Sequence, residues 1–167
     1  AVLLAWLLPG EEADPAAEPP APGVMAAHLA VYGSPSLAAP AAGWLFYTFT
    51  YVALLAVLPL TLSPAEGRAL AALAPLAGIA LSMSVGVWLL RRMPAVQVVL
   101  WGFGLALALT PFLGLGVVPA VALFAALGLV QGASFAAVPE LAQSGRDRAL
   151  ANGALAQMGN TGNLLGT

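Results

Sequence analysis

Long apolar runs, separated by short polar or charged breaks, dominate the pattern of this chain. About 20 apolar residues cover the roughly 30 Å of hydrocarbon in a bilayer, so each long run predicts a membrane-spanning helix. The runs are continuous, whereas strands of a membrane barrel alternate apolar and polar residues in segments of about ten. The pattern therefore predicts an all-α integral membrane protein, with helices at residues 41–62, 69–90, 95–113, 117–141 and 149–167, the last of them incomplete.

The breaks between these spans carry the charges and the turn-forming residues. Charged segments at 63–68, 91–92 and 144–148 separate the spans that they flank. The 47 residues from Met93 to Pro139 carry no charge. As a single helix they would measure about 70 Å, twice the thickness of a bilayer. The chain must therefore turn once between them, and Gly114, Gly116 and Pro119 mark that turn.

The first 40 residues follow a different pattern. Residues 1–8 form a short apolar run, which we expect to be the end of a further membrane helix, so that the chain is a fragment of a larger membrane protein. Acidic residues and prolines then alternate, and residues 9–40 are expected to form a cytoplasmic linker. Within it, the apolar stretch from Val24 to Tyr32 is too short to span a bilayer and predicts a helix that lies along the interface.

Composition supports the membrane interpretation. Hydrophobic residues make up 61% of the chain and charged residues 7%, and the mean hydropathy is +0.95. Soluble domains carry about 25% charged residues, so this chain has too little charge to cover a globule in water. Its net charge is −2, with five arginines and no lysine, which leaves no basic surface for nucleic acid. Soluble enzymes and nucleic-acid-binding modules are excluded.

The residues needed for catalysis or metal binding are also scarce. His28 is the sole histidine and cysteine is absent, so the sequence holds no zinc-ligand set. A Ser–His–Asp arrangement inside the membrane is not available, and no glycine-rich phosphate loop follows a strand. We therefore expect no enzymatic activity, no metal and no cofactor.

The distribution of arginine predicts the orientation. Alternation of the spans places four arginines on one side and Arg68 alone on the other, and cytoplasmic loops are enriched in basic residues. The arginine-rich loops and the linker are therefore expected in the cytoplasm. Glu140 borders the same side, and its interpretation stays open between a gate that pairs with these arginines and an interfacial residue paired locally. The candidates for this cytoplasmic charge cluster are Arg91, Arg92, Glu140, Arg146 and Arg148.

The spans differ in polarity. The span 95–113 is the plainest and is expected to face lipid. Polar side chains in hydrocarbon are costly unless they face protein or water, so 41–62, 117–141 and 149–167 are expected to face an interior. Packing is the other interpretation of each polar residue, because such groups join membrane helices by about 0.6–2 kcal/mol per contact. The candidates for a substrate cavity are Tyr47, Thr50, Tyr51, Gln131, Ser134, Gln157 and Asn160.

Two further patterns concern helix contacts and the cavity. Small residues recur at intervals of four, which lets helix backbones approach closely; they are Gly78, Ser82 and Gly86, then Gly128 and Gly132, then Gly162 and Gly166. Gln157 and Asn160 lie one helical turn apart beside Gly159 and Gly162. We expect these glycines to leave open room around the two amides, which makes the pair the strongest candidate for a role in binding.

Five stretches of the sequence resemble segments of bacterial permeases of the major facilitator superfamily: Trp44–Tyr51, Ala53–Pro59, Gly86–Arg92, Gly132–Glu140 and Ala149–Asn160. In their order, the segments of the whole chain resemble the C-terminal half of such a permease. The resemblance implies two six-helix halves that alternate access around a central site. It places residues 1–8 at the end of helix six, the four complete spans at helices seven to ten and the last span at helix eleven. Helices seven and ten would then line the cavity, and helix nine would face lipid.

One position departs from the pattern of the family. The family's cytoplasmic loop signature pairs a glycine and an aspartate with basic residues, and its second copy would fall at Gly86–Arg92. The acidic position is absent, and Leu90 stands near it. A role of Arg91 and Arg92 in fixing the orientation of the chain in the membrane therefore explains them as well as a role in gating does.

The leading hypothesis is a secondary active transporter, which moves a small solute across a bacterial plasma membrane by alternating access. Its partners would be the solute, the lipid bilayer and the missing N-terminal half of the same protein. The alternative is a membrane-embedded scaffold or subunit that does not transport. The two differ in where the polar residues point. Convergence on a wet cleft favours transport, and burial of each residue against a neighbouring helix favours a scaffold.

Overall fold

The computed structural model describes residues 23–167, which are helical over about 90% of their length and contain no strand. The expectations for residues 1–8 and for the linker up to residue 22 lie outside this range. The helices are α2 (Val24–Tyr32), α3 (Pro35–Thr61), α4 (Pro64–Leu81), α5 (Val87–Leu90), α6 (Ala95–Leu109), α7 (Val117–Leu141) and α8 (Gly145–Gly166). A π-helical turn (Ser82–Gly86) joins α4 to α5, and a 3₁₀ segment (Thr110–Leu115) follows α6.

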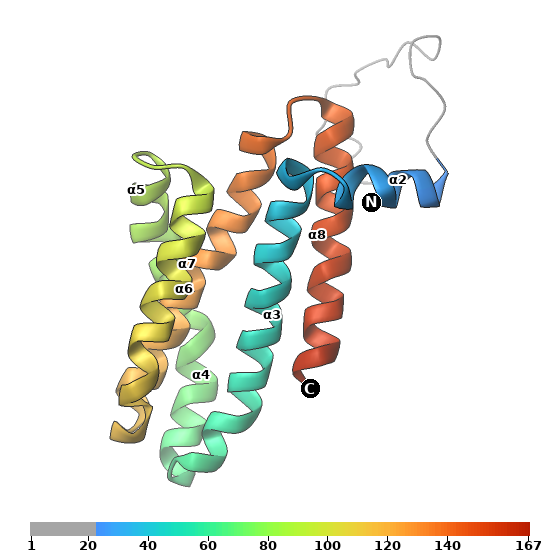
Figure 1. The fold of residues 1–167 in the computed structure, drawn as a ribbon. Helices are drawn as coiled ribbons and strands as arrows, with labels where there is room; N and C mark the ends of the chain where they lie inside the picture. The colour runs from blue at the N-terminus through green and yellow to red at the C-terminus, as the bar shows by residue number, and fades with distance from the viewer. Residues whose placement is uncertain (1–22) are drawn as a thin grey trace, which may run out of the picture.

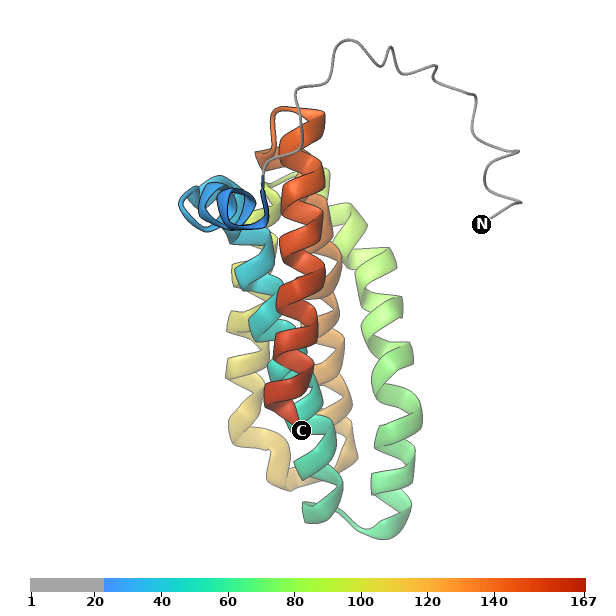
Figure 2. The ribbon, with the colours of Figure 1, turned by 90° about the vertical axis from the view of Figure 1, so that its right-hand side faces the viewer.

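Four helical segments of the described chain are long and apolar enough to cross a membrane: Pro35–Thr61, Pro64–Leu90, Ala95–Leu115 and Val117–Leu141. They run side by side as a bundle, together with α8 (Figures 1 and 2). The predicted all-α class is therefore confirmed, with four candidate membrane spans. α8 is not one of the four because its amide side chains lower its hydropathy. Its passage through a membrane stays a prediction.

Local chemistry explains where these helices begin. Pro64 occupies the first turn of α4, where a missing N–H costs nothing. Ser63 and Glu66 form a capping box: the carboxylate of Glu66 accepts a bond from the Ser63 N–H at 3.1 Å, and the Ser63 hydroxyl accepts one from the Glu66 N–H at 3.3 Å. Before α7, Gly116 adopts a φ of 108°, a left-handed conformation that favours glycine. Both turns fall where the hydropathy pattern predicts them.

Three helices begin earlier than predicted. α4 starts at Pro64 rather than at residue 69, because the capping box begins it there. α3 starts at Pro35 rather than at residue 41, because Ser34-Pro35 ends the preceding turn and the apolar residues that follow continue the helix. The prediction of a loop through residues 145–148 is wrong. Ser144 accepts a hydrogen bond from the Asp147 N–H at 3.0 Å, so the charged residues form the first turn of α8. The charged residues therefore precede the apolar part of α8 but belong to the same helix.

α7 occupies the centre of the bundle. About 61% of its 18-residue apolar stretch is buried, against 17–22% of the corresponding stretches in the other three candidate spans. It packs against α3, α4 and α6, and its side chains Leu123, Phe124 and Leu127 are almost fully buried. α6 has the lowest buried share, 17%, and it exposes large apolar residues such as Leu100 and Leu107. This outward face agrees with the plain composition of the segment.

Small residues allow the closest helix contacts, as their spacing predicts. On α7, a Cβ at Gly128 would collide with the backbone of Gly78 on α4, and a Cβ at Gly132 would collide with the side chain of Ser82. On α8, a Cβ at Gly166 would lie 2.8 Å from the carbonyl oxygen of Phe49 on α3. α4 and α7 therefore touch backbone to backbone, as do α3 and α8.

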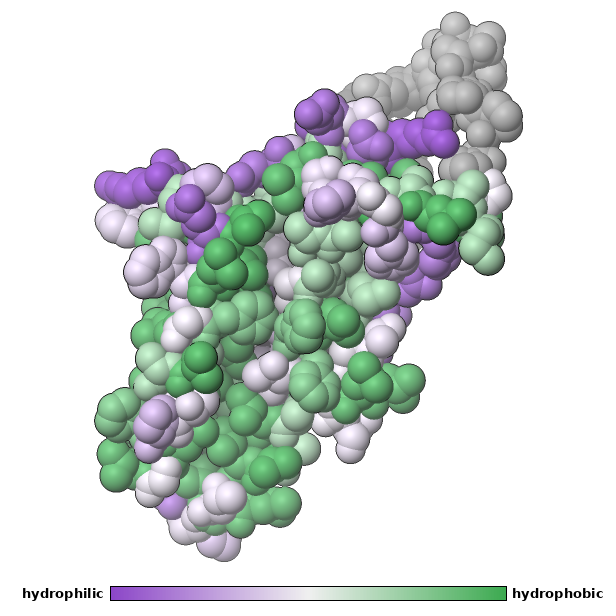
Figure 3. Space-filling view, viewed as in Figure 1, coloured by the Kyte–Doolittle hydropathy of each residue, from purple (hydrophilic) through white to green (hydrophobic). Residues whose placement is uncertain are grey.

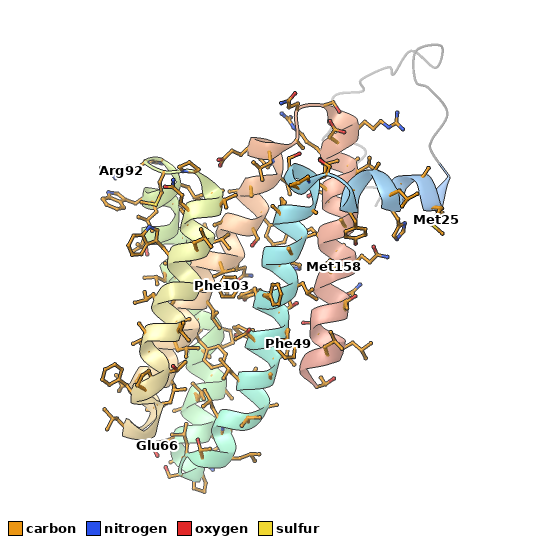
Figure 4. The ribbon with its side chains drawn as sticks, viewed as in Figure 1. Met25, Phe49, Glu66, Arg92, Phe103 and Met158 are labelled. Atoms are coloured by element: carbon orange, nitrogen blue, oxygen red, sulfur yellow. The ribbon has the colours of Figure 1, made fainter. Side chains whose placement is uncertain are left out.

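Polar and apolar parts of the molecule are separated along the bundle axis. The turns that carry Arg91 and Arg92 and Arg146 and Arg148 lie at one end, whereas Glu66 lies at the other (Figures 1 and 4). Hydrophilic side chains gather at the arginine-rich end, and apolar ones cover the flanks (Figure 3). α2 has the predicted bounds and runs across the bundle near this end (Figure 1).

Candidate functional site

An open groove of about 320 Å³ lies between α8 and the helices α3 and α7. All the side chains that line it are uncharged: Trp44, Thr48, Phe135, Asn152, Leu155, Ala156, Gly159, Asn160 and Asn163. The three asparagines share one side of α8 because residues 8 and 11 positions apart return to the same face of a helix. The groove therefore combines amide groups on one wall with aromatic rings on the other.

A row of aromatic rings continues from this groove along the contact between α3 and α7. Phe135 packs edge-on against Trp44 at 4.7 Å between ring centroids, and Trp44 stacks on Tyr47 at 4.9 Å. Tyr47 lies 5.5 Å from Tyr51, which packs edge-on against Phe124 at 4.9 Å. Aromatic pairs at such separations contribute about 0.5–1.5 kcal/mol beyond the area that they bury. The row fixes the position of α3 on α7.

Two of the predicted cavity residues bind each other inside this contact. The Tyr47 hydroxyl donates a hydrogen bond to Oε1 of Gln131 at 3.1 Å, and only 7% of Tyr47 is exposed. Ser134, one turn along α7, is 1% exposed and faces Gly43 of α3. Its hydroxyl has no hydrogen-bond partner among the residues that the structure describes. These residues lie beside the groove, at a helix contact.

Thr50 and Tyr51 point to different places. Thr50 lines a separate apolar cavity of about 290 Å³, with Leu54 of its own helix and with Phe103 and Thr110 from α6 and the segment that follows it. Tyr51 belongs to the aromatic row. Successive residues of a helix point about 100° apart, which separates the two side chains although they are neighbours in sequence.

Gln157 and Asn160 do not converge. Oε1 of Gln157 accepts a hydrogen bond from the Tyr32 hydroxyl at 3.0 Å, and its amide nitrogen lies 3.2 Å from Nε2 of His28, so this amide contacts α2. Asn160 lines the groove instead. Asn160 thus has the open room that the sequence predicts, but the glycines beside it do not create that room. A Cβ at Gly159 would collide with Trp44, and one at Gly162 with Thr48, so these glycines let α8 pack closely on α3.

The charged candidates at the arginine-rich end contact helix termini and a ring. Oε2 of Glu140 accepts a hydrogen bond at 2.9 Å from the N–H of Ala95, the first residue of α6. Nε of Arg148 donates to the carbonyl oxygen of Ala142, just past the end of α7, at 3.3 Å. The guanidinium of Arg92 lies 4.0 Å from the centre of the Trp88 ring. For Glu140, this geometry favours the interpretation of local pairing. Arg91 and Arg146 are exposed.

Glu140→Gln is expected to lower the stability of the protein by about 0.5–1 kcal/mol. The first N–H groups of a helix have no partner within it and carry partial positive charge, so a carboxylate stabilises them more than an amide oxygen does. Thermal unfolding in detergent measures the change. An unchanged Tm for Glu140→Gln would contradict this role.

Of the nine residues that line the groove, only Asn160 belongs to the predicted cavity set. Asn152 and Asn163 could have been found, because they share a helical face with Asn160. Trp44 and Phe135 are large aromatic residues in apolar helices, and nothing in their sequence context distinguishes them from lipid-facing residues. Only the packing of α3 on α7 brings them to the groove.

No protein-family model, no curated protein and no solved structure matches this chain. The resemblance to permeases therefore rests on the sequence stretches quoted above.

Proposed function

We propose that this chain is the C-terminal half of a secondary active transporter of the major facilitator type, which moves a small solute by alternating access. The observation that carries the proposal is the open, uncharged groove lined by Trp44, Phe135 and three asparagines. Amide groups exposed to hydrocarbon are costly, so amides on an open surface of a bundle between apolar helices require water or a polar solute. The amides and rings of this groove suit a neutral solute.

The direction of the amide row supports the same proposal. Asn152 and Asn163 are 11 residues apart on α8, which corresponds to about 16 Å along the helix axis. The polar wall therefore extends along the axis of the bundle, from the arginine-rich end towards its middle. Transport by alternating access uses a site near the middle of the bilayer that opens to one side at a time.

A membrane scaffold that does not transport is the second candidate. Two side-chain pairs favour it: Tyr47 with Gln131 and Tyr32 with Gln157. Each joins two helices, which is the packing role of polar groups in membrane proteins. In a scaffold, the groove would contact a protein partner or stay closed to water.

Cysteine accessibility distinguishes these two functions. The chain contains no cysteine, so Asn160→Cys would supply the single thiol of this region. In the full-length protein without other cysteines, a charged, membrane-impermeant thiol reagent is expected to label this position from either face of the membrane. A site that alternates is open to water on each side in turn.

Leu107→Cys is the control for this labelling. Leu107 is 72% exposed on α6, on the face predicted to contact lipid, and a charged reagent is not expected to reach it. Labelling of Asn160→Cys from one face alone, or from neither, would contradict alternating access and favour the scaffold.

A further inference from the structure

A second groove, also of about 320 Å³, lies on another face of α8, where α2 crosses it. Its volume is at the lower end of the range for small-ligand sites. Ala27 and Val31 of α2 form one wall, and Leu150, Gly153 and Ala154 of α8 form the other. The site is therefore a mostly apolar slot between two crossing helices.

A chain of hydrogen bonds holds α2 in this position. Nδ1 of His28 lies 2.8 Å from the carbonyl oxygen of Val24, so Nδ1 carries the proton and donates it. Nε2 then accepts from the amide nitrogen of Gln157 at 3.2 Å, while Oε1 of Gln157 accepts from Tyr32 at 3.0 Å. Both polar residues of α2 are thereby fixed to one residue of α8, which keeps the slot open.

The outer side of α2 is strongly apolar. Val24, Met25 and Leu29 are 77%, 73% and 69% exposed, and the helix carries no acidic or basic residue other than His28. Met25 projects from the end of α2, away from the bundle (Figure 4). Large apolar side chains on so short a helix are favourable where they enter lipid at a membrane interface. The groove then opens into the lipid beside α2.

Arg146 lies on the same face of α8 as this groove, closer to the arginine-rich end of the bundle. Arg146 precedes Leu150 by four residues, Gly153 by seven and Gln157 by eleven, and these spacings return to one side of a helix. Its side chain is exposed at the arginine-rich end. The residues of α8 that line the groove lie about 5–16 Å further along the helix than Arg146. A guanidinium at this level matches the phosphate of a lipid whose acyl chain enters the groove.

We propose that the groove between α2 and α8 binds one anionic phospholipid, with its phosphate at Arg146 and an acyl chain packed along Gly153. The charge of Arg146, the apolar walls and the lipid-facing side of α2 all fit this ligand. The proposal requires a membrane around the bundle but no transport, so its test is independent of the proposed function.

Native mass spectrometry of the full-length protein in mild detergent tests the proposal, with phosphatidylglycerol and phosphatidylcholine of identical acyl chains as probes. The parent protein is expected to retain one phosphatidylglycerol and to prefer it about fivefold, the effect of one arginine near an anionic headgroup. Gly153→Leu fills the slot and is expected to weaken retention of both lipids about tenfold. Arg146→Gln is expected to abolish the preference and to keep acyl-chain binding.

Two variants control for the substitutions themselves. A Cβ at Gly153 meets no atom within 4 Å, and the same holds for Gly104 on α6, so Gly104→Leu is the matched control for added bulk. Arg91→Gln removes an exposed charge at the same end of the bundle, away from the groove. Both should bind like the parent.

Three results would overturn the proposal. In the first, the parent retains no phosphatidylglycerol. In the second, Gly153→Leu retains it as well as the parent does. In the third, inorganic phosphate at matched concentration displaces the lipid, which would leave a simple anion site at Arg146.

Discussion

Gly128→Leu is expected to leave most of the full-length protein misfolded. A Cβ at this position would collide with the backbone of Gly78, and backbone atoms of a packed helix cannot turn aside as a side chain can. Overpacking in a core costs about 1–3 kcal/mol when side chains can adjust, and this contact exceeds that range because α4 itself must move. α7 is the most buried of the four candidate spans, so its displacement disturbs its neighbours as well.

Size-exclusion chromatography and thermal unfolding in detergent measure this effect. Gly104→Leu makes the same change on α6, where a Cβ meets no atom within 4 Å, and it should leave both the monodisperse fraction and the Tm close to those of the parent. Gly128→Ala should give an intermediate loss, because its single methyl group already meets Gly78. If Gly128→Leu behaved like the parent, the described contact between α4 and α7 would be wrong.

Asn160→Leu is expected to reduce uptake by the full-length protein to background while leaving its amount in the membrane unchanged. The substitution removes a polar group from the groove and fills part of its volume with an apolar side chain. Leucine favours both helix formation and membrane insertion, so the loss reports on the groove rather than on folding. Uptake of labelled neutral solutes, chosen from those that the parent carries, measures the effect, and immunoblotting of membranes measures the amount.

Gln97→Leu is the matched control for this variant, because it makes the same amide-to-leucine change at an exposed position near the start of α6. Gln157→Leu is expected to reduce uptake only partly, because Gln157 contacts α2 rather than the groove. Full uptake by Asn160→Leu would assign the amides of α8 to packing, and the scaffold would become the better proposal.

The sequence predicts the helices best where composition changes sharply. The bounds of α7 follow from the glycines before it and from the polar residues after it, and α5 ends at Leu90 before the two arginines. Prediction fails where a helix continues past such a boundary. The arginines and Asp147 at the start of α8 predict a loop, yet Ser144 precedes them and caps the helix that contains them. Charges end a membrane span, but they do not end a helix in water.

The residues of the site are harder to predict than the helices. Helical spacing shows which side chains share a face, but it does not show which helix meets that face. Tyr47 and Gln131 were both candidates, and their pairing depends on how α3 packs on α7. Gln157 was expected to act with Asn160, although the two point about 60° apart on the helix. Gln157 instead binds Tyr32 of the short helix α2, and nothing in the sequence of α8 predicts that contact.

The tightest glycine contacts divide the bundle into two bodies. α3 and α8 touch through Gly162 and Gly166, and α4 and α6 approach α7 through Gly128 and Gly102. Between these bodies lie the aromatic row and the bond from Tyr47 to Gln131. Rings and amides can change rotamer, whereas backbones in contact resist sliding. Relative movement within the bundle therefore meets least resistance as shear along the aromatic row, with α3 and α8 moving together past α4, α6 and α7.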